Sequence, residues 1–181
     1  MSQHLYVVRG FIDGPLCLTV RAAMDRGVGE AAEVLRDTMT EQHDVRRAEM
    51  IEIDQDVLTR IERLLDDQLP AIEEFFGVPL TELEGTGFLR YRDGGFYLPH
   101  VDRVDDAAWP GAERRSITVV VFLNDEGFSG GVLRVDDEDV VPAAGTLVAF
   151  PADVLHEVTP VRGAPRDTIV DWCLSPRRRA E

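Results

Sequence analysis

The chain has 181 residues, 44% hydrophobic and 29% charged, a composition typical of a globular protein with one substantial core. Its 34 acidic and 19 basic residues give a net charge of −15, and this field repels phosphate backbones, so we expect no nucleic acid as a direct partner. The sequence has neither a long apolar stretch nor a secretory signal pattern, and Cys17 and Cys173 share no motif, so we expect a cytoplasmic protein with no membrane contact.

The first 84 residues are predicted to form a strand and supporting helices. Asp13-Gly14-Pro15 is a turn signal that ends the first strand. In chain order we expect a strand at residues 5–12, helices at 16–25 and 29–40, and a short strand at 48–53.

The clearest helix is predicted at residues 54–76. Asp54 can cap its first turn, Gly77 stands where a C-terminal glycine belongs, and Pro70 should kink the helix or split it in two. One face is apolar, at Val57, Ile61, Leu64, Leu65, Leu69 and Ile72. This stripe is expected to pack against a sheet.

From residue 85 the pattern changes to short strands separated by Gly, Pro and Asp clusters. The expected strands are 88–91, 96–102, 116–124, 131–135, 146–150, 156–160 and 168–174. They predict a mostly β fold, a double-stranded β-helix (jelly-roll) barrel with the N-terminal helices on one face. We expect a single domain over residues 1–181, with the jelly-roll core at 85–175 and a solvated tail at 176–181.

Three potential metal ligands follow in the order His100, Asp102 and His156. Side chains two apart on a strand point the same way, so His100 and Asp102 should converge from one strand, and His156 begins another strand-like run. Two imidazoles and one carboxylate leave three coordination positions open, the arrangement of non-haem iron oxygenases. The pattern therefore predicts an iron(II) site.

Arg166 follows His156 by ten residues. Its guanidinium offers a rigid fork of donors that matches a carboxylate. A turn at residues 162–165 would let the chain return and set Arg166 near the metal. This spacing indicates a docking charge for an acidic co-substrate.

Several short sequence segments around these residues resemble those of a known family. They are Gly94-Gly95-Phe96-Tyr97, residues 117–124, Gly130-Gly131-Val132-Leu133 and residues 145–151. From about Phe88 to Trp172 the chain resembles the prolyl-4-hydroxylase-like branch of the 2-oxoglutarate and Fe(II)-dependent dioxygenases.

That resemblance implies an enzyme, a hydroxylase. It assigns Fe(II) to His100, Asp102 and His156, and the C5 carboxylate of 2-oxoglutarate to Arg166 and Tyr91, with Tyr97 as the alternative to Tyr91. It also implies O2 as co-substrate and ascorbate as a stimulant. The reaction would hydroxylate an unactivated C–H bond of an amino-acid, peptide or protein side chain and produce succinate and CO2. Asp102 occupies the position a halide would need, which favours hydroxylation over halogenation; desaturation and cyclisation stay open.

The chain departs from several relatives at Phe122, where they carry a tyrosine before the Leu-Asn pair. Trp172 fits the family's aromatic residue in the last strand and fits a core position equally well. Residues 103–115, with Trp109, are either a substrate lid or an irregular connection packed on the barrel.

Two other classes of function remain compatible with the sequence. A cupin-like metal enzyme that does not use 2-oxoglutarate would share the barrel, but it would have no use for Arg166. A non-catalytic jelly-roll binding module would carry the ligand-like residues by coincidence or as a structural metal site. The sequence leaves the substrate and the oligomeric state open.

Overall fold

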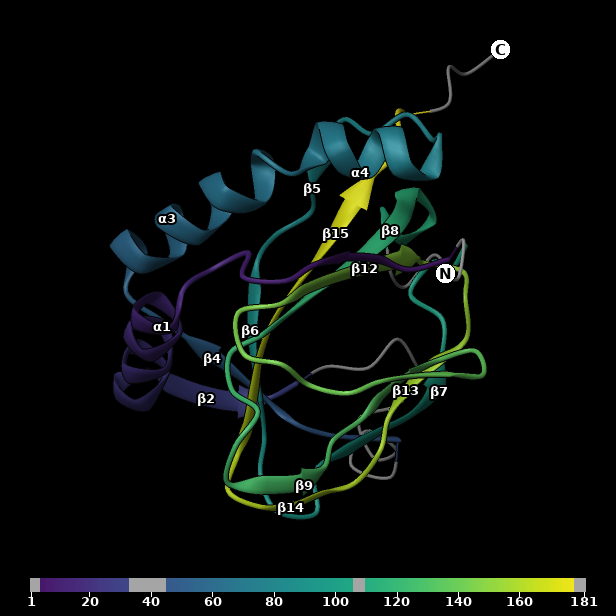
Figure 1. The fold of residues 1–181 in the computed structure, drawn as a ribbon. Helices are drawn as coiled ribbons and strands as arrows, with labels where there is room; N and C mark the ends of the chain where they lie inside the picture. The colour runs from purple at the N-terminus through teal and green to yellow at the C-terminus, as the bar shows by residue number, and fades with distance from the viewer. Residues whose placement is uncertain (1–3, 33–44, 106–109, 178–181) are drawn as a thin grey trace.

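The computed structural model describes residues 4–32, 45–105 and 110–177, which form two principal antiparallel sheets with helices on one side (Figure 1). In the spatial order of the large sheet, its strands are β1 (Tyr6–Val8), β12 (Leu147–Pro151), β8 (Arg115–Phe122), β15 (Arg166–Leu174), β6 (Gly87–Tyr91), β4 (Glu49–Glu52) and β2 (Val28–Ala31), and β5 (Glu82–Leu83) pairs with β15. The small sheet contains β11 (Glu138–Val140), β10 (Leu133–Val135), β13 (His156–Val158), β7 (Phe96–His100) and β3 (Arg46–Arg47). A separate pair joins β14 (Val161–Gly163) to β9 (Phe128–Gly130).

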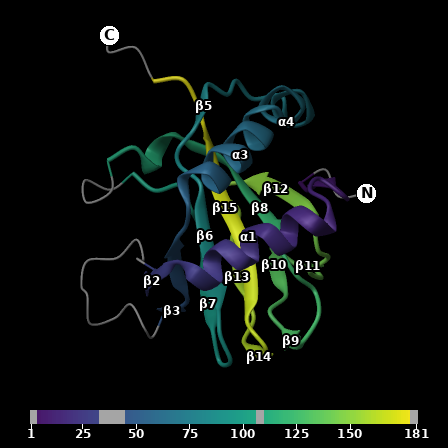
Figure 2. The same ribbon diagram turned by 90° about the vertical axis from the view of Figure 1, so that its left-hand side faces the viewer.

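The helices cover the outer face of the large sheet, and Figure 2 shows α1 and α3 in front of its strands. They are α1 (Gly14–Arg26), α3 (Gln55–Asp66) and α4 (Leu69–Phe76), and a short 3-10 turn, η2 (Ala112–Arg114), precedes β8. The carboxylate of Asp13 accepts a hydrogen bond from the N–H of Leu16 at 2.8 Å and caps α1. The predicted split near Pro70 is confirmed, because α3 ends at Asp66 and α4 begins at Leu69 with this proline in its first turn.

Alternation along β8 separates two apolar layers. Val119 and Val121 pack in the cluster that also contains the apolar residues of the helices. Val120 and Phe122 point the other way, into a second cluster with Leu133 of the small sheet. The large sheet is thus buried on both faces at β8, and its inner face together with the small sheet encloses the interior.

The predicted fold class is confirmed: the chain is mostly β, with helices on one face and two facing sheets of the jelly-roll type. The sheets are not joined into a closed barrel over the described residues. The predicted strands are present with shifted ends: the first is limited to Tyr6–Val8, β13 ends at Val158, and β15 begins two residues early, at Arg166.

The predicted helix at residues 29–40 is wrong where the structure describes it, because Val28–Ala31 form β2. This strand pairs with β4 so closely that a Cβ at Gly27 would lie 2.1 Å from the carbonyl oxygen of Glu52, and one at Gly29 would lie 2.9 Å from Cδ1 of Ile51. At Gly27, which also ends α1, the neighbour is backbone, so only glycine allows this close approach.

Some predictions lie outside the described residues, namely residues 33–40 of that helix, Trp109 and residues 178–181 of the tail. Over the part of the chain that the structure describes, no helix is long and apolar enough to cross a bilayer.

Candidate metal and co-substrate site

Three side chains that can bind a divalent metal converge on the inner side of the small sheet. His100 is the last residue of β7, Asp102 lies two positions further on, and His156 is the first residue of β13. Strand pairing places His100 opposite His156, with ring centroids 4.1 Å apart. One potential ligand atom from each of the three lies within 4.8 Å of the others. The structure thus brings together the three ligands that the sequence predicted.

Hydrogen bonds orient both imidazoles toward a shared point. Nδ1 of His100 is 2.8 Å from the carbonyl oxygen of Leu98, and Nδ1 of His156 is 2.9 Å from that of Val154. A carbonyl oxygen only accepts, so each Nδ1 carries the hydrogen, and each Nε2 is the nitrogen that the neutral ring offers to a metal. The Nε2 atoms of His100 and His156 lie 3.6 Å and 3.3 Å from the carboxylate oxygens of Asp102. Histidines that bind metals are commonly held in this way.

Asp102 reaches the site by a different route from the predicted one. The sequence placed it within a strand at residues 96–102, but β7 ends at His100. Regular alternation also fails in β7, because Tyr97 and His100 stack on one another with ring centroids 3.5 Å apart. Pro99 has no N–H to donate, and the pairing with β13 is irregular here. The N–H of Asp102 instead donates to the carbonyl of Ala152 at 2.8 Å, which holds Asp102 beside the histidines.

Thr118 of β8 is a contact that the sequence analysis missed. Its hydroxyl lies 2.7 Å from Oδ2 of Asp102 and donates to it. Thr118 is 1% exposed and shares the inner face of β8 with the apolar Val120 and Phe122. A single polar side chain on the inward face of an apolar strand was the available signal, since such a group needs a buried partner.

The charges of the triad suit a divalent cation. Burial and the neighbouring His156 lower the pKa of His100 to about 3. Burial would raise the pKa of Asp102, but the two imidazoles outweigh it and hold that pKa well below its usual value. Burial also opposes protonation of His156, yet the Asp102 carboxylate raises the pKa of this ring. A divalent cation bound between the three side chains would replace the proton on His156 and neutralise the charge of the Asp102 carboxylate.

Arg166, the first residue of β15, is a buried cation with unused donors. Its side chain is 1% exposed, and its Nε and Nη2 atoms have no hydrogen-bond partner among the described residues. The guanidinium carbon lies over two rings, 5.2 Å from the centroid of Tyr91 and 5.3 Å from that of Phe122. Burial lowers the pKa of Arg166 to about 10. An unpaired buried guanidinium is costly, and a ligand carboxylate would supply the missing acceptors.

The two candidate tyrosines occupy different places. Tyr91 lies directly opposite Arg166 in the ladder between β6 and β15. Tyr97 stacks on His100 and carries the guanidinium of Arg46 4.6 Å from its own ring centroid. Tyr91 is therefore the tyrosine beside the buried arginine, whereas Tyr97 is the neighbour of a metal-ligand candidate.

The triad and Arg166 line a common cavity of about 370 Å³. Its walls between them are largely apolar, with Leu89, Val158 and Val170 among the lining residues. The cavity extends to β4 and β2 at the edge of the large sheet, where Glu30 and Glu52 line it. Such a space can hold a small acidic molecule next to a metal and still leave room for a second ligand.

Two aromatic residues complete the cavity region. Phe122 is fully buried beside Arg166, and its ring brings no hydroxyl to that guanidinium. Trp172 lines the cavity, and the guanidinium carbon of Arg115 lies 3.8 Å from its ring centroid. Arg115 in turn pairs with Glu84 and approaches the carbonyl oxygen of Asp102 at 3.5 Å. Trp172 thus faces the site as well as packing against its neighbours.

Comparison with known proteins agrees with this geometry. The sequence model of the 2OG-Fe(II) oxygenase superfamily matches residues 86–174. A PKHD-type hydroxylase of Maricaulis maris is 35% identical over 97 residues, which are 51% of this chain and 42% of that protein. One from a Shewanella species is 29% identical over 136 residues, 72% of this chain and 61% of that protein. The chain therefore spans about half the length of these relatives.

Solved structures share the fold over nearly the whole chain. A prolyl-4-hydroxylase from Pseudomonas putida has 26% sequence identity and a TM-score of 0.75, covering 96% of this chain and 94% of that one. A prolyl hydroxylase from Trichoplax adhaerens, solved with a peptide of the oxygen degradation domain of hypoxia inducible factor, has a TM-score of 0.78 and 17% identity, covering 96% of this chain and 84% of that one. The second likeness concerns the fold alone.

Proposed function

This chain belongs to the 2OG-Fe(II) oxygenase superfamily, and on that premise we propose that it is an Fe(II)- and 2-oxoglutarate-dependent hydroxylase. The observation that carries the proposal is the pairing, in one cavity, of a His-Asp-His triad with a buried arginine whose donors are unused. Bound Fe(II), with 2-oxoglutarate and O2, would supply the oxidising power: one oxygen atom enters the substrate C–H bond, and the other enters succinate as CO2 is released.

His100, Asp102 and His156 would hold the iron. Their role is to present two lone-pair nitrogens and one carboxylate from a single side, which leaves the remaining positions for ligands that are not protein. The carbonyls behind His100 and His156 keep the imidazoles in the required tautomer.

Arg166 and Tyr91 would bind the C5 carboxylate of 2-oxoglutarate. The guanidinium supplies charge and paired donors, and the phenol hydroxyl across the ladder can supply another donor. Phe122 brings no hydroxyl to the contact with Arg166, whereas Thr168, two residues further along β15, also lines the cavity.

We infer that the second substrate is an amino-acid, peptide or protein side chain, with prolyl hydroxylation as the nearest analogy. Support comes from the prolyl-4-hydroxylase of Pseudomonas putida, which shares 26% sequence identity with this chain. The cavity runs from the triad to β2 and β4, where Glu30 and Glu52 line it, and apolar side chains such as Leu89 and Val170 line it as well.

The buried arginine separates this proposal from its rivals. In a cupin-like metal enzyme without 2-oxoglutarate, Arg166 would stay buried without an acceptor. This would lower the stability of the fold, and no bound ligand would compensate for it. A non-catalytic binding module would not need three ligand atoms within 4.8 Å of one another beside that arginine.

Turnover without a prime substrate gives a test that needs no knowledge of the second substrate. The purified protein, supplied with Fe(II), 2-oxoglutarate, O2 and ascorbate, should form succinate slowly, and formation should stop when either the iron or the oxygen is withheld. Proline-containing peptides that stimulate this rate and gain one oxygen atom by mass spectrometry would identify the substrate class. Succinate formation that is absent under every condition, in a protein that binds Fe(II), would refute the proposal.

A further inference from the structure

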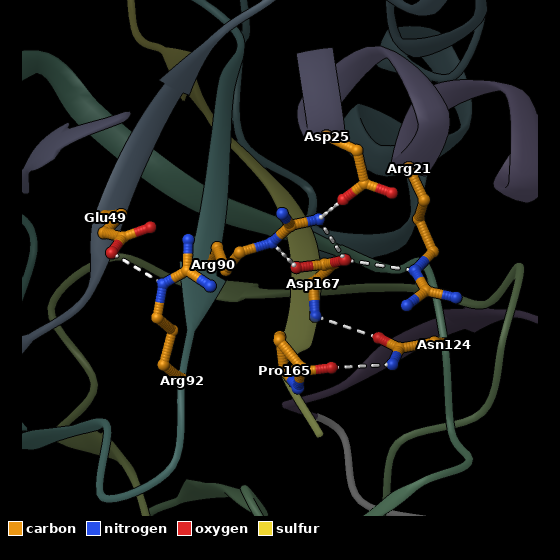
Figure 3. Close-up of polar contacts among 8 residues, drawn as sticks. All are labelled: Arg21, Asp25, Glu49, Arg90, Arg92, Asn124, Pro165 and Asp167. Atoms are coloured by element: carbon orange, nitrogen blue, oxygen red, sulfur yellow. Dashed lines mark hydrogen bonds and ion pairs between the residues drawn. The ribbon is translucent and has the colours of Figure 1, made fainter. Parts of the chain in front are cut away.

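The main chain on both sides of Arg166 is held by one side chain. The carboxamide of Asn124 accepts a hydrogen bond from the N–H of Asp167 at 2.9 Å and donates one to the carbonyl of Pro165 at 2.9 Å (Figure 3). Asn124 lies two residues past the end of β8, where the ladder with β15 has stopped. Its side chain continues the pairing on this side of β15 as far as Arg166, the residue with which the strand begins.

Asp167 holds the same segment from the opposite face of the sheet. Side chains alternate along β15, so Arg166 points into the cavity while Asp167 points toward α1. Both carboxylate oxygens of Asp167 bind the guanidinium of Arg90, at 2.7 Å and 2.9 Å, and Arg21 of α1 binds one of them at 3.0 Å. Figure 3 shows the arginines converging on this carboxylate, which is fully buried.

A fourth charge completes the network and connects it to the helix again. Oδ1 of Asp25 in α1 forms an ion pair with Nη2 of Arg90 at 2.8 Å. Two guanidiniums therefore face two carboxylates, which balances the charge of the group. Since Arg90 is on β6 next to Tyr91, the network also fixes the strand that carries the tyrosine facing Arg166.

We propose that Asn124 and Asp167, here called the positioning pair, set the place of Arg166 for the C5 carboxylate of 2-oxoglutarate. The inference rests on the proposed function. Neither residue is among those that line the cavity, so both act through Arg166. Two-pronged recognition of a carboxylate depends on small displacements of the guanidinium, and a strand end that loses these contacts would let it move.

The direction of the change in 2-oxoglutarate affinity distinguishes positioning of Arg166 from a purely electrostatic effect of the charge that is removed. Asn124→Ala removes both main-chain hydrogen bonds without altering any charge. Asp167→Asn removes a negative charge next to Arg166, so Coulomb attraction alone would make an anionic ligand bind more tightly. Positioning predicts that both variants bind 2-oxoglutarate about tenfold more weakly, equivalent to about 1.4 kcal/mol.

The test compares two ligands of the iron-loaded protein without oxygen. 2-Oxopentanoate has the same chain as 2-oxoglutarate with a methyl group in place of the C5 carboxylate, so it reports the metal end of the site alone. Dissociation constants for both ligands, in the parent protein and the variants, give the preference for the C5 carboxylate. In Asn124→Ala and Asp167→Asn this preference should fall about tenfold, while binding of 2-oxopentanoate and of iron stays unchanged.

Asp171→Asn is the matched control. Asp171 is a buried carboxylate on the same face of β15, and it binds the N–H of Gly85 and the hydroxyl of Thr86. Its loss should lower the melting temperature and keep the preference. An equal loss of preference in this control, or an unchanged preference in both pair variants, would overturn the inference. A parent protein that does not prefer 2-oxoglutarate to 2-oxopentanoate would instead refute the role of Arg166 in the proposed function.

Discussion

His100 and His156 lie opposite one another between β7 and β13, and each donates its Nδ1 hydrogen to the carbonyl two residues before it. This symmetry leaves both Nε2 atoms free to face Asp102. Nitrogen atoms in this arrangement would meet a metal ion already oriented, and Arg166 lies in the same cavity.

Loss of either histidine should abolish iron binding. His100→Ala and His156→Ala each leave two ligands, which are too few to hold Fe(II) at micromolar concentration. Circular dichroism should show an intact fold, because the two imidazoles contact the apolar clusters at Tyr97 and Phe150 and are not part of the clusters themselves. Equilibrium dialysis with Fe(II) measures the loss, and His4→Ala, at an exposed position, is the control. Undiminished binding in either triad variant would contradict the assignment.

Thr118→Val should weaken metal binding without destroying the site. The hydroxyl fixes Oδ2 of Asp102 at 2.7 Å, and the loss of such a contact typically lowers metal affinity by about 10- to 100-fold. A competition titration with a chelator measures the affinity for Mn(II) as a redox-stable substitute. Thr146→Val, at a buried threonine that does not line the cavity, should leave the affinity unchanged. Equal affinities for all three proteins would mean that Asp102 needs no such support.

Arg166→Ala should weaken 2-oxoglutarate binding by roughly one to two orders of magnitude, because a charge-assisted pair in a partly dry cavity is lost. Iron affinity should change little, since no metal-ligand candidate contacts this guanidinium among the described hydrogen bonds and ion pairs. Arg166→Lys should recover only part of the loss, because an ammonium keeps the charge and loses the fork. Arg134→Ala removes an exposed arginine as a control. An unchanged dissociation constant in Arg166→Ala would remove the main support for 2-oxoglutarate.

Tyr91→Phe and Tyr97→Phe should separate the two ends of the cavity. If Tyr91 donates to the C5 carboxylate, its loss should weaken 2-oxoglutarate binding by about three- to tenfold and leave iron affinity unchanged. Tyr97→Phe keeps the ring that stacks on His100 and should alter neither affinity much. Calorimetric titration of both variants gives the comparison, and the opposite order of effects would assign the co-substrate contact to Tyr97.

Local patterns in the sequence predicted most of the fold. The apolar stripe with Pro70 and Gly77 predicted both helices and the break between them, because these signals act within one turn. Asp54 stands at the N-terminus of α3, but its side chain makes no capping hydrogen bond and pairs with Arg26 instead. The helix predicted at 29–40 was wrong, because its first residues form β2. They pair with β4, some twenty residues away in sequence, and a local pattern does not show this pairing. Strands β3, β5, β9, β11 and β14 were also missed, as each is short and defined by its partner, and β14 occupies part of the turn predicted at residues 162–165. That residues 1–181 form a single domain stays a prediction.

The site was predictable as a set of residues, and its supporting contacts were not. Spacing identified His100, Asp102, His156 and Arg166, which the structure brings into one cavity. Strand alternation was the wrong reason for Asp102, which lies beyond β7 and is held by the carbonyl of Ala152. Contacts such as that between Thr118 and Asp102 depend on which strands become neighbours, and no local pattern contains that information.

Anaerobic titration of the protein with Fe(II) and then 2-oxoglutarate tests the central claim most directly. A bidentate 2-oxo acid on Fe(II) gives a weak visible charge-transfer band, and its growth reports both ligands at once. We expect the band to appear at one equivalent of iron, to saturate with 2-oxoglutarate, to vanish in His156→Ala, and to need much more 2-oxoglutarate in Arg166→Ala. A protein that binds Fe(II) and gives no band at saturating 2-oxoglutarate would contradict the assignment of this cavity to an Fe(II)- and 2-oxoglutarate-dependent reaction.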